Sequence, residues 1–172
     1  DIYEEDILNH LVTVKSMNNF GCLGYKAGEN KYDFAELTED KVNAFFDVLN
    51  NMAGYVFVDC TDEENDLISQ IALRNAHEVI MVLSPDLKSM VYLASNEELF
   101  GTNSERAIRV LNVNENELYS PVDDVRTNVK NIEYILPFSK QVRSQQLDGL
   151  LYERAKDKKY RAVLSKMVNR II

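Results

Sequence analysis

The stretch at positions 54–86 decides how we interpret this chain. It opens with the apolar run Tyr55-Val56-Phe57-Val58, which ends on Asp59. A polar turn and a segment with helical spacing follow, and then a second apolar run at 79–83 stops at Ser84-Pro85-Asp86. Short, wholly apolar runs separated by an amphipathic helix are typical of parallel strands buried on both faces. The sequence therefore predicts a strand–helix–strand unit here.

Polar residues follow both predicted strands. Ligands in parallel sheets bind at the carboxyl ends of the strands, where Asp59, Ser84 and Asp86 fall. An acid after an apolar strand fits a Walker B carboxylate, which holds Mg²⁺ through water in nucleotide enzymes. Asp59 is equally well explained as an exposed acid that caps the following helix. The spacing leaves both interpretations open.

The alternation of strand and helix patterns continues through the chain. It predicts an α/β fold with a mainly parallel sheet, helices on both faces and right-handed crossovers. We expect strands at 20–25, 55–58, 79–83, 107–113 and 132–136, helices at 2–17, 66–77, 87–95 and 160–172, a further helix that Thr38 caps, a turn at 100–103, and shorter segments at 125–129 and 141–147.

Length and composition favour one soluble domain over residues 1–172. Hydrophobic residues make up 45% and charged residues 27%, an ordinary balance for a globular protein. The two cysteines, Cys22 and Cys60, form no metal-binding spacing, which favours a cytoplasmic protein. Because the chain starts at Asp1 rather than Met, we expect a fragment, a processed product or the ordered part of something longer.

Charge is unevenly distributed along the chain. Seven basic residues against two acids give residues 151–172 a charge of +5, so the net charge of −9 leaves −14 for the rest. Acidity over most of the surface argues against broad nucleic-acid binding and leaves only the last helix for a nucleic-acid or membrane contact. The apolar stripe of that helix fits packing against a sheet better than a membrane surface.

Several familiar catalytic patterns do not occur. The glycine-rich stretch 21–28 is not a phosphate-binding loop, because no glycine in the chain is followed by lysine. His10 and His77 have no ligand partners at metal-binding spacing, and Cys60 has no histidine partner for nucleophilic catalysis.

Taken together, several segments resemble the ParA/MinD family of deviant-Walker ATPases, including its CpaE/TadZ-like branch. The run ending in Asp59 looks like the Walker B strand of that family, and the segment at 82–89 is similar to the next strand and its proline-acid turn. The similarity extends to Asn19-Phe20-Gly21-Cys22-Leu23-Gly24, Val110-Leu111-Asn112, Ile135-Leu136-Pro137-Phe138-Ser139 and Gly149.

The resemblance implies a P-loop-NTPase-like fold of which this chain covers the later two-thirds, without the first strand and the P-loop. It assigns Asp59 to a water-mediated Mg²⁺ site, Asn112 to adenine recognition, and Pro137 with Phe138 to a wall of the base pocket. The turn after Asp59 lacks the glycine usual in the second switch. Without the P-loop lysine, triphosphate has no cradle, so we expect no ATPase activity from this chain alone.

The resemblance implies an intact protein that binds ATP and Mg²⁺, dimerises, and positions chromosomes, plasmids, the septum or pilus machinery. Such a protein would be cytoplasmic, or peripheral at a membrane or cell pole, and would bind protein partners of a positioning or secretion system. One alternative is a non-catalytic ParA-like localisation or scaffold module. Another is a receiver-like signalling domain in which Asp59 accepts phosphate; against it, the last strand ends Leu136-Pro137 where receivers have Lys-Pro.

Overall fold

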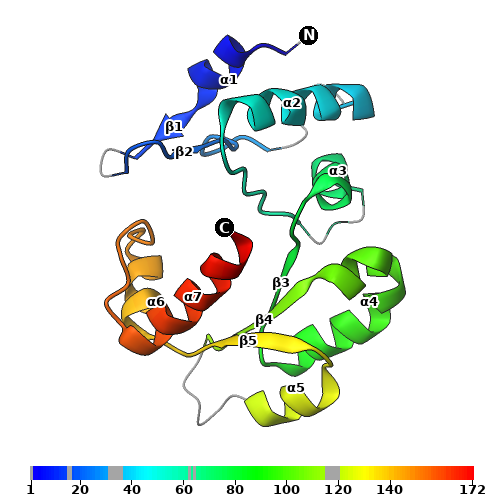
Figure 1. Ribbon diagram of the computed structural model, residues 1–172, viewed down its shortest axis with the longest axis vertical. Coiled ribbons are helices and arrows are strands. Elements are labelled where there is room, and N and C mark those ends of the chain that lie inside the picture. The colour runs from blue at the N-terminus through cyan, green and yellow to red at the C-terminus, as the bar shows by residue number, and fades with distance from the viewer. Residues whose placement is uncertain (1, 15–16, 31–36, 62, 64, 115–120) are drawn as a thin grey trace. The chain divides into compact units, whose positions relative to one another are not determined.

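The structure is a computed structural model that describes residues 2–14, 17–30, 37–61, 63, 65–114 and 121–172 (Figure 1), with only the backbone for 97–105. The chain divides into two compact units, Asp1–Asn75 and Ala76–Ile172, which are described separately below. That the two units make up one domain stays a prediction.

The first unit begins with a short helix and a pair of very short strands. Its elements are α1 (Glu4–His10), β1 (Val12–Thr13), β2 (Gly21–Cys22), α2 (Glu39–Met52) and α3 (Leu67–Asn75). β1 and β2 pair antiparallel, with Val12 opposite Cys22. The predicted helix at 2–17 is therefore wrong at 11–14, because Leu11 is extended and the β-branched residues after it enter a strand. Residues 15–16 of the predicted helix lie outside the described part of the chain.

Helices α2 and α3 form the core of the first unit. Thr38 caps α2 as predicted, its Oγ1 accepting a hydrogen bond from the backbone N–H of Lys41 at 3.4 Å. An ion pair between Arg74 and Glu39 links the two helices at the surface. The buried side chains of this core are Val42, Phe46, Ile71 and Ala72.

The predicted strand at 55–58 is wrong, because these residues form no strand in the structure. Tyr55 is 59% exposed and Phe57 is 74% exposed, so the run is not buried on both faces either. β-branched and aromatic residues favour a strand only where neighbouring strands supply hydrogen bonds and packing. The sequence pattern shows that this run favours an extended conformation, but it does not show which other strand would pair with it.

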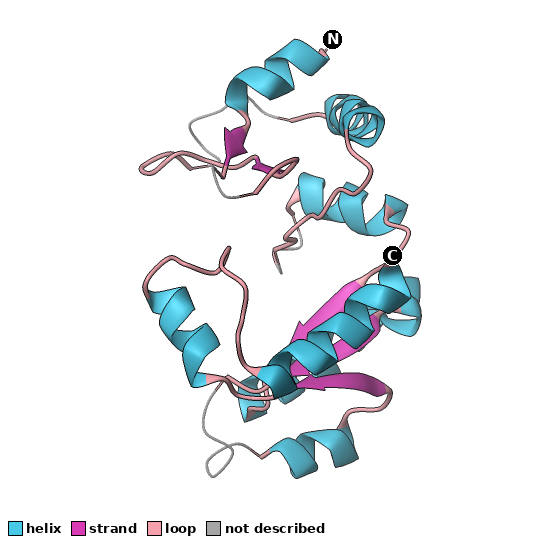
Figure 2. Ribbon diagram, turned by 60° about the vertical axis from the view of Figure 1, so that its left-hand side comes forward, coloured by secondary structure: helices cyan, strands magenta, loops and turns pink. Residues whose placement is uncertain are grey.

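The second unit contains a parallel three-stranded sheet in the order β3-β4-β5 (Figures 1 and 2). All three strands lie within ranges that the sequence predicts. Helix α4 extends well beyond the predicted end at 95, so the predicted turn at 100–103 is wrong, and the segment near 125 is helical. The elements are β3 (Ile80–Leu83), α4 (Leu87–Arg106), β4 (Ile108–Asn112), α5 (Val122–Asn128), β5 (Ile132–Leu136), α6 (Lys140–Leu147) and α7 (Lys158–Ile171).

Helices cover both faces of this sheet. Ile108 and Val110 of β4 belong to the apolar cluster on the face that α7 covers, whereas Leu111 belongs to the cluster on the opposite face. The second cluster includes Leu93 of α4 and Val125 of α5. The α/β class, the parallel sheet and its coverage on both faces are therefore confirmed for the second unit.

Helix α7 packs its apolar side on the sheet, as the sequence predicts, and Figure 2 shows it lying across the strands. An ion pair between Arg170 and Glu133 joins the end of α7 to β5. Among the described helices, none combines the length and apolarity needed to cross a membrane. The packed side chains of α7 are Tyr160, Val163, Leu164, Met167 and Ile171.

Candidate functional site

The carboxyl ends of β4 and β5 bring together three of the residues that the sequence singles out. Asn112 is aligned with Leu136, the last residue of β5, and the backbone N–H of Val113 donates to the Leu136 carbonyl at 3.0 Å. Pro137 and Phe138 follow directly, so they lie beside the strand end that carries Asn112. All three are partly exposed. Polar and aromatic groups at adjacent parallel strand ends are a usual setting for a ligand.

The end of β3 adds two further polar groups to this edge. The Asn114 amide lies 3.5 Å from the Ser84 hydroxyl, linking the segment after β4 to the end of β3. Asp86 is engaged in starting α4, because its Oδ1 accepts a hydrogen bond from the backbone N–H of Ser89 at 2.7 Å. Ser84 is therefore the group at this strand end that is better placed to meet a ligand, and Asp86 has a structural role.

The turn that carries Pro137 and Phe138 is anchored to the start of two helices. Buried Ser139 caps α6 through a 3.4 Å bond from the N–H of Val142, and its hydroxyl also donates to the Asp157 carboxylate. Asp157 in turn caps α7 by accepting from the N–H of Tyr160 at 3.2 Å and of Lys159 at 3.0 Å.

The hydrogen bonds at Asp157 also shift its acidity. The bond from the Tyr160 N–H, followed by that from Ser139, stabilises the ionised carboxylate and lowers the pKa of Asp157. The charged carboxylate therefore holds the turn after β5 and the first turn of α7 in fixed positions. Phe138 directly precedes Ser139, which takes part in these hydrogen bonds.

Asp59 belongs to the first unit, so the structure relates only Asn112, Pro137 and Phe138 to one another. Asp59 is exposed, and the strand it was predicted to end is not formed. Of the alternative interpretation, the exposure of Asp59 is confirmed, whereas the cap of α3 comes from Asp66, which accepts from the N–H of Ser69 at 2.8 Å.

The segment that follows Asp59 is hydrogen-bonded to α3. Ser69 Oγ accepts from the N–H of Thr61 at 3.0 Å, and Cys60 is half-buried beside it. Burial raises the pKa of the Cys60 thiol; a hydrogen bond with Ser69 opposes this, and the nearby charges of Asp59 and Asp66 add to the increase. Cys60 is thus held in the less reactive thiol form.

Within the described residues, no group of three or more histidine, cysteine, aspartate or glutamate side chains could hold a metal ion. The assignment of Asp59 to a water-mediated Mg²⁺ site therefore stays a prediction, as do the ATP and Mg²⁺ that the resemblance implies.

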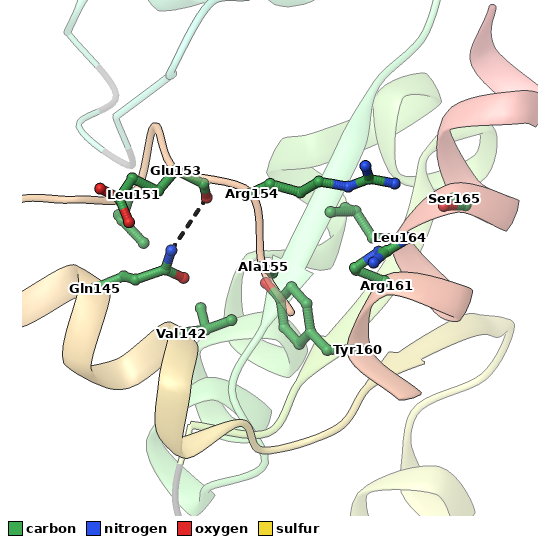
Figure 3. Close-up of a pocket in the computed structure, with 10 residues that line it drawn as sticks. All are labelled: Val142, Gln145, Leu151, Glu153, Arg154, Ala155, Tyr160, Arg161, Leu164 and Ser165. Atoms are coloured by element: carbon green, nitrogen blue, oxygen red, sulfur yellow. Dashed lines mark hydrogen bonds between the residues drawn. The ribbon is translucent and has the colours of Figure 1, made fainter. Parts of the chain in front are cut away.

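A second feature of the second unit is a pocket of about 370 Å³ between α6, the segment 150–157 and α7 (Figure 3). Sequence reasoning treated its arginines as part of a solvated basic tail. The only signal that could have indicated a pocket was the concentration of positive charge around the start of α7. The lining residues are Val142, Gln145, Leu151, Glu153, Arg154, Ala155, Tyr160, Arg161, Leu164 and Ser165.

Comparison with known proteins gave no match to a family model, to a curated protein or to a solved structure. Function is therefore argued from the residues and their geometry.

Proposed function

We propose that the second unit is a nucleotide-binding module of the ParA/MinD type, with its adenine side at the carboxyl ends of β4 and β5. The observation that carries this proposal is the pairing of Asn112 with Leu136, which sets Asn112 beside the strand end that Pro137 and Phe138 follow. An amide can both donate to and accept from the edge of adenine, and an aromatic ring can stack on its face. The P-loop-NTPase-like fold that the resemblance implies is part of the same proposal.

In this proposal the intact protein is a dimeric ATPase that positions cellular cargo, in the cytoplasm or at a membrane or pole. Asp59 would hold Mg²⁺ through water, and a P-loop from a preceding segment would hold the phosphates. The chain studied has no P-loop sequence, so its affinity for a nucleotide should come from the base and not from the triphosphate.

The first part of the test compares nucleosides and nucleotides by ¹H–¹⁵N chemical-shift titration. We expect adenosine and ATP to bind the chain with similar, weak affinity, and guanosine to bind more weakly. Shifts should centre on residues 112 and 137–138. Guanosine binding as tight as adenosine, or ATP hydrolysis by the purified chain, would contradict the proposal.

The second part uses matched variants. Asn112→Ala should weaken adenosine binding by about 10-fold, since removing a hydrogen bond leaves a polar edge of the base unpaired. Asn169→Ala, the same change on the exposed surface of α7, should have no effect. If neither adenosine nor ATP binds the folded protein, the nucleotide role is refuted and the non-catalytic scaffold alternative takes its place.

The receiver alternative would require Asp59 at the end of a strand, and residues 55–58 form no strand. The same finding removes the strand on which the Walker B interpretation rested. The nucleotide proposal therefore depends on the second unit.

A further inference from the structure

We propose that the pocket between α6 and α7 binds a small organic phosphate, with the phosphate group on Arg154 and Arg161 and an apolar body against Val142 and Leu164. This site is separate from the strand ends discussed above, and the inference does not rest on the proposed function.

The segment that carries Arg154 is fixed to α6 on both sides of the arginine. Buried Gln145 donates from Nε2 to the backbone carbonyl of Glu153 at 3.2 Å. Gln141 accepts through Oε1 from the N–H of Lys156 at 2.6 Å and of Asp157 at 3.1 Å. Because the segment is already ordered, a ligand that binds Arg154 does not have to order the backbone as well.

Two arginines, Arg154 and Arg161, and one acid, Glu153, line the pocket, so its charged side chains sum to +1. Figure 3 shows the Arg154 side chain extended from the segment toward α7, the helix that carries Arg161 and Ser165. No carboxylate among the described residues forms an ion pair with either arginine. Residues 153–161 hold five bases against two acids, Glu153 at the pocket and Asp157, which is engaged with backbone N–H groups of α7.

Phosphate is the anion that these groups suit best. Two arginines offer planar forks of N–H donors that match phosphate oxygens, and a serine hydroxyl can donate a further hydrogen bond. Ser165 lies one helical turn after Arg161, so both reach the same side of α7. A phosphate monoester can accept all of these bonds at once, whereas a carboxylate has only two oxygens.

The remaining wall of the pocket is apolar. Val142 of α6 and Leu164 of α7 line it from two different helices. Tyr160 of α7 also lines the pocket and packs on the sheet. A volume of about 370 Å³ is at the small end of ligand pockets, enough for a phosphate and one ring. A mostly apolar body would therefore add to the affinity that the phosphate gives.

The experiment uses phenyl phosphate as the probe, titrated into the whole chain and followed by ¹H–¹⁵N chemical shifts. We expect saturable binding with a Kd of about 1 mM or below, with shifts centred on residues 142–165. Inorganic phosphate and benzoate should each bind more weakly, the first for lack of an apolar body and the second for lack of phosphate oxygens. Equal binding of either one would overturn the corresponding half of the proposal.

Two charge variants and a control complete the test. Arg154→Gln and Arg161→Gln should each weaken phenyl phosphate binding by about 10-fold, as expected for loss of a charge-assisted hydrogen bond. Lys166→Gln makes the same charge change on α7 outside the pocket and should leave the Kd within about twofold. Arg154 is exposed, so its variant should retain the wild-type spectrum. No saturable binding, or equal weakening by Lys166→Gln, would refute the site.

Discussion

The substitution Leu111→Ala tests the central strand on which the whole second unit depends. Leu111 is fully buried in β4, and it packs in the cluster that α4 and α5 cover. Removing a fully buried leucine side chain costs roughly 3 kcal/mol, from lost burial and the cavity left behind. The matched change Val82→Ala, on the neighbouring strand β3, removes a side chain that is 61% exposed and should cost roughly 0.5 kcal/mol.

Amide hydrogen exchange is the suitable assay for this pair. The chain has no tryptophan, and its two compact units need not unfold together, so a single optical transition would not report on β4 alone. A loss of about 3 kcal/mol should speed exchange of the β4 amides by roughly 150-fold where exchange follows global opening of the unit. Val82→Ala should change it by only a few-fold. If Val82→Ala accelerates exchange as much as Leu111→Ala, or if Leu111→Ala accelerates it less than about 5-fold, the burial pattern of the sheet is wrong.

Three further predictions follow from single positions. Because folding lowers the pKa of Asp157, its charged form stabilises the fold at neutral pH, and this contribution is lost as the pH falls through the lowered pKa. Between about pH 7 and about pH 2.5, the melting temperature should therefore fall less for Asp157→Asn than for the wild-type chain. An equal fall in melting temperature would contradict this. Iodoacetamide at about pH 8 should label exposed Cys22 faster than half-buried Cys60, because the raised pKa of Cys60 reduces its thiolate fraction. Peptide mass spectrometry measures both labelling rates, and equal rates would refute the difference. Gly149→Ala should destabilise the second unit by about 1 kcal/mol, as measured by hydrogen exchange, because Gly149 lies just after α6 with φ +69°. The control Gly54→Ala should be nearly neutral, because Gly54 has no positive φ and a Cβ there would lie in open space.

The strands of the second unit could be predicted because each is mostly apolar, although Arg109 interrupts the run in β4 and Glu133 interrupts it in β5. Ile108, Val110 and Leu111 are all fully buried, two on one face of the sheet and one on the other. A strand buried on both faces needs apolar side chains on both sides, so a mostly apolar segment of this length indicates such a strand. The adjacency of Asn112 and Pro137 follows from the same logic, since both end neighbouring parallel strands.

The first unit shows where local patterns fail. The run at 55–58 has a composition as favourable for a strand as that of β4, yet Phe57 is largely exposed and no strand forms. Pairing is a non-local property, because it depends on which other segment lies alongside. The helix predicted at 2–17 failed for a related reason, since Leu11 packs against Gly21, where any Cβ would come within 2.6 Å of the leucine side chain. Nothing within residues 2–17 indicates that contact.

The pocket between α6 and α7 was also beyond sequence reasoning. Its frame depends on Gln141 and Gln145, whose side chains reach 8 to 16 residues along the chain to hold backbone groups. Glutamines at i and i+4 on a helix are ordinary surface residues by composition. Only the folded chain shows that both point toward one segment and fix Arg154 in place.

The overall acidity of the chain does not argue against an anion site at that pocket. Residues 1–75 hold fifteen acids against five bases, whereas residues 76–172 hold thirteen acids against fourteen bases. The unit that contains the pocket is thus close to neutral, and its bases are concentrated around the start of α7. At physiological ionic strength the screening length is about 8 Å, so an anion near Arg154 and Arg161 responds to the local charges. If long-range repulsion from the acidic residues dominated instead, added salt would strengthen phenyl phosphate binding; we expect salt to weaken it.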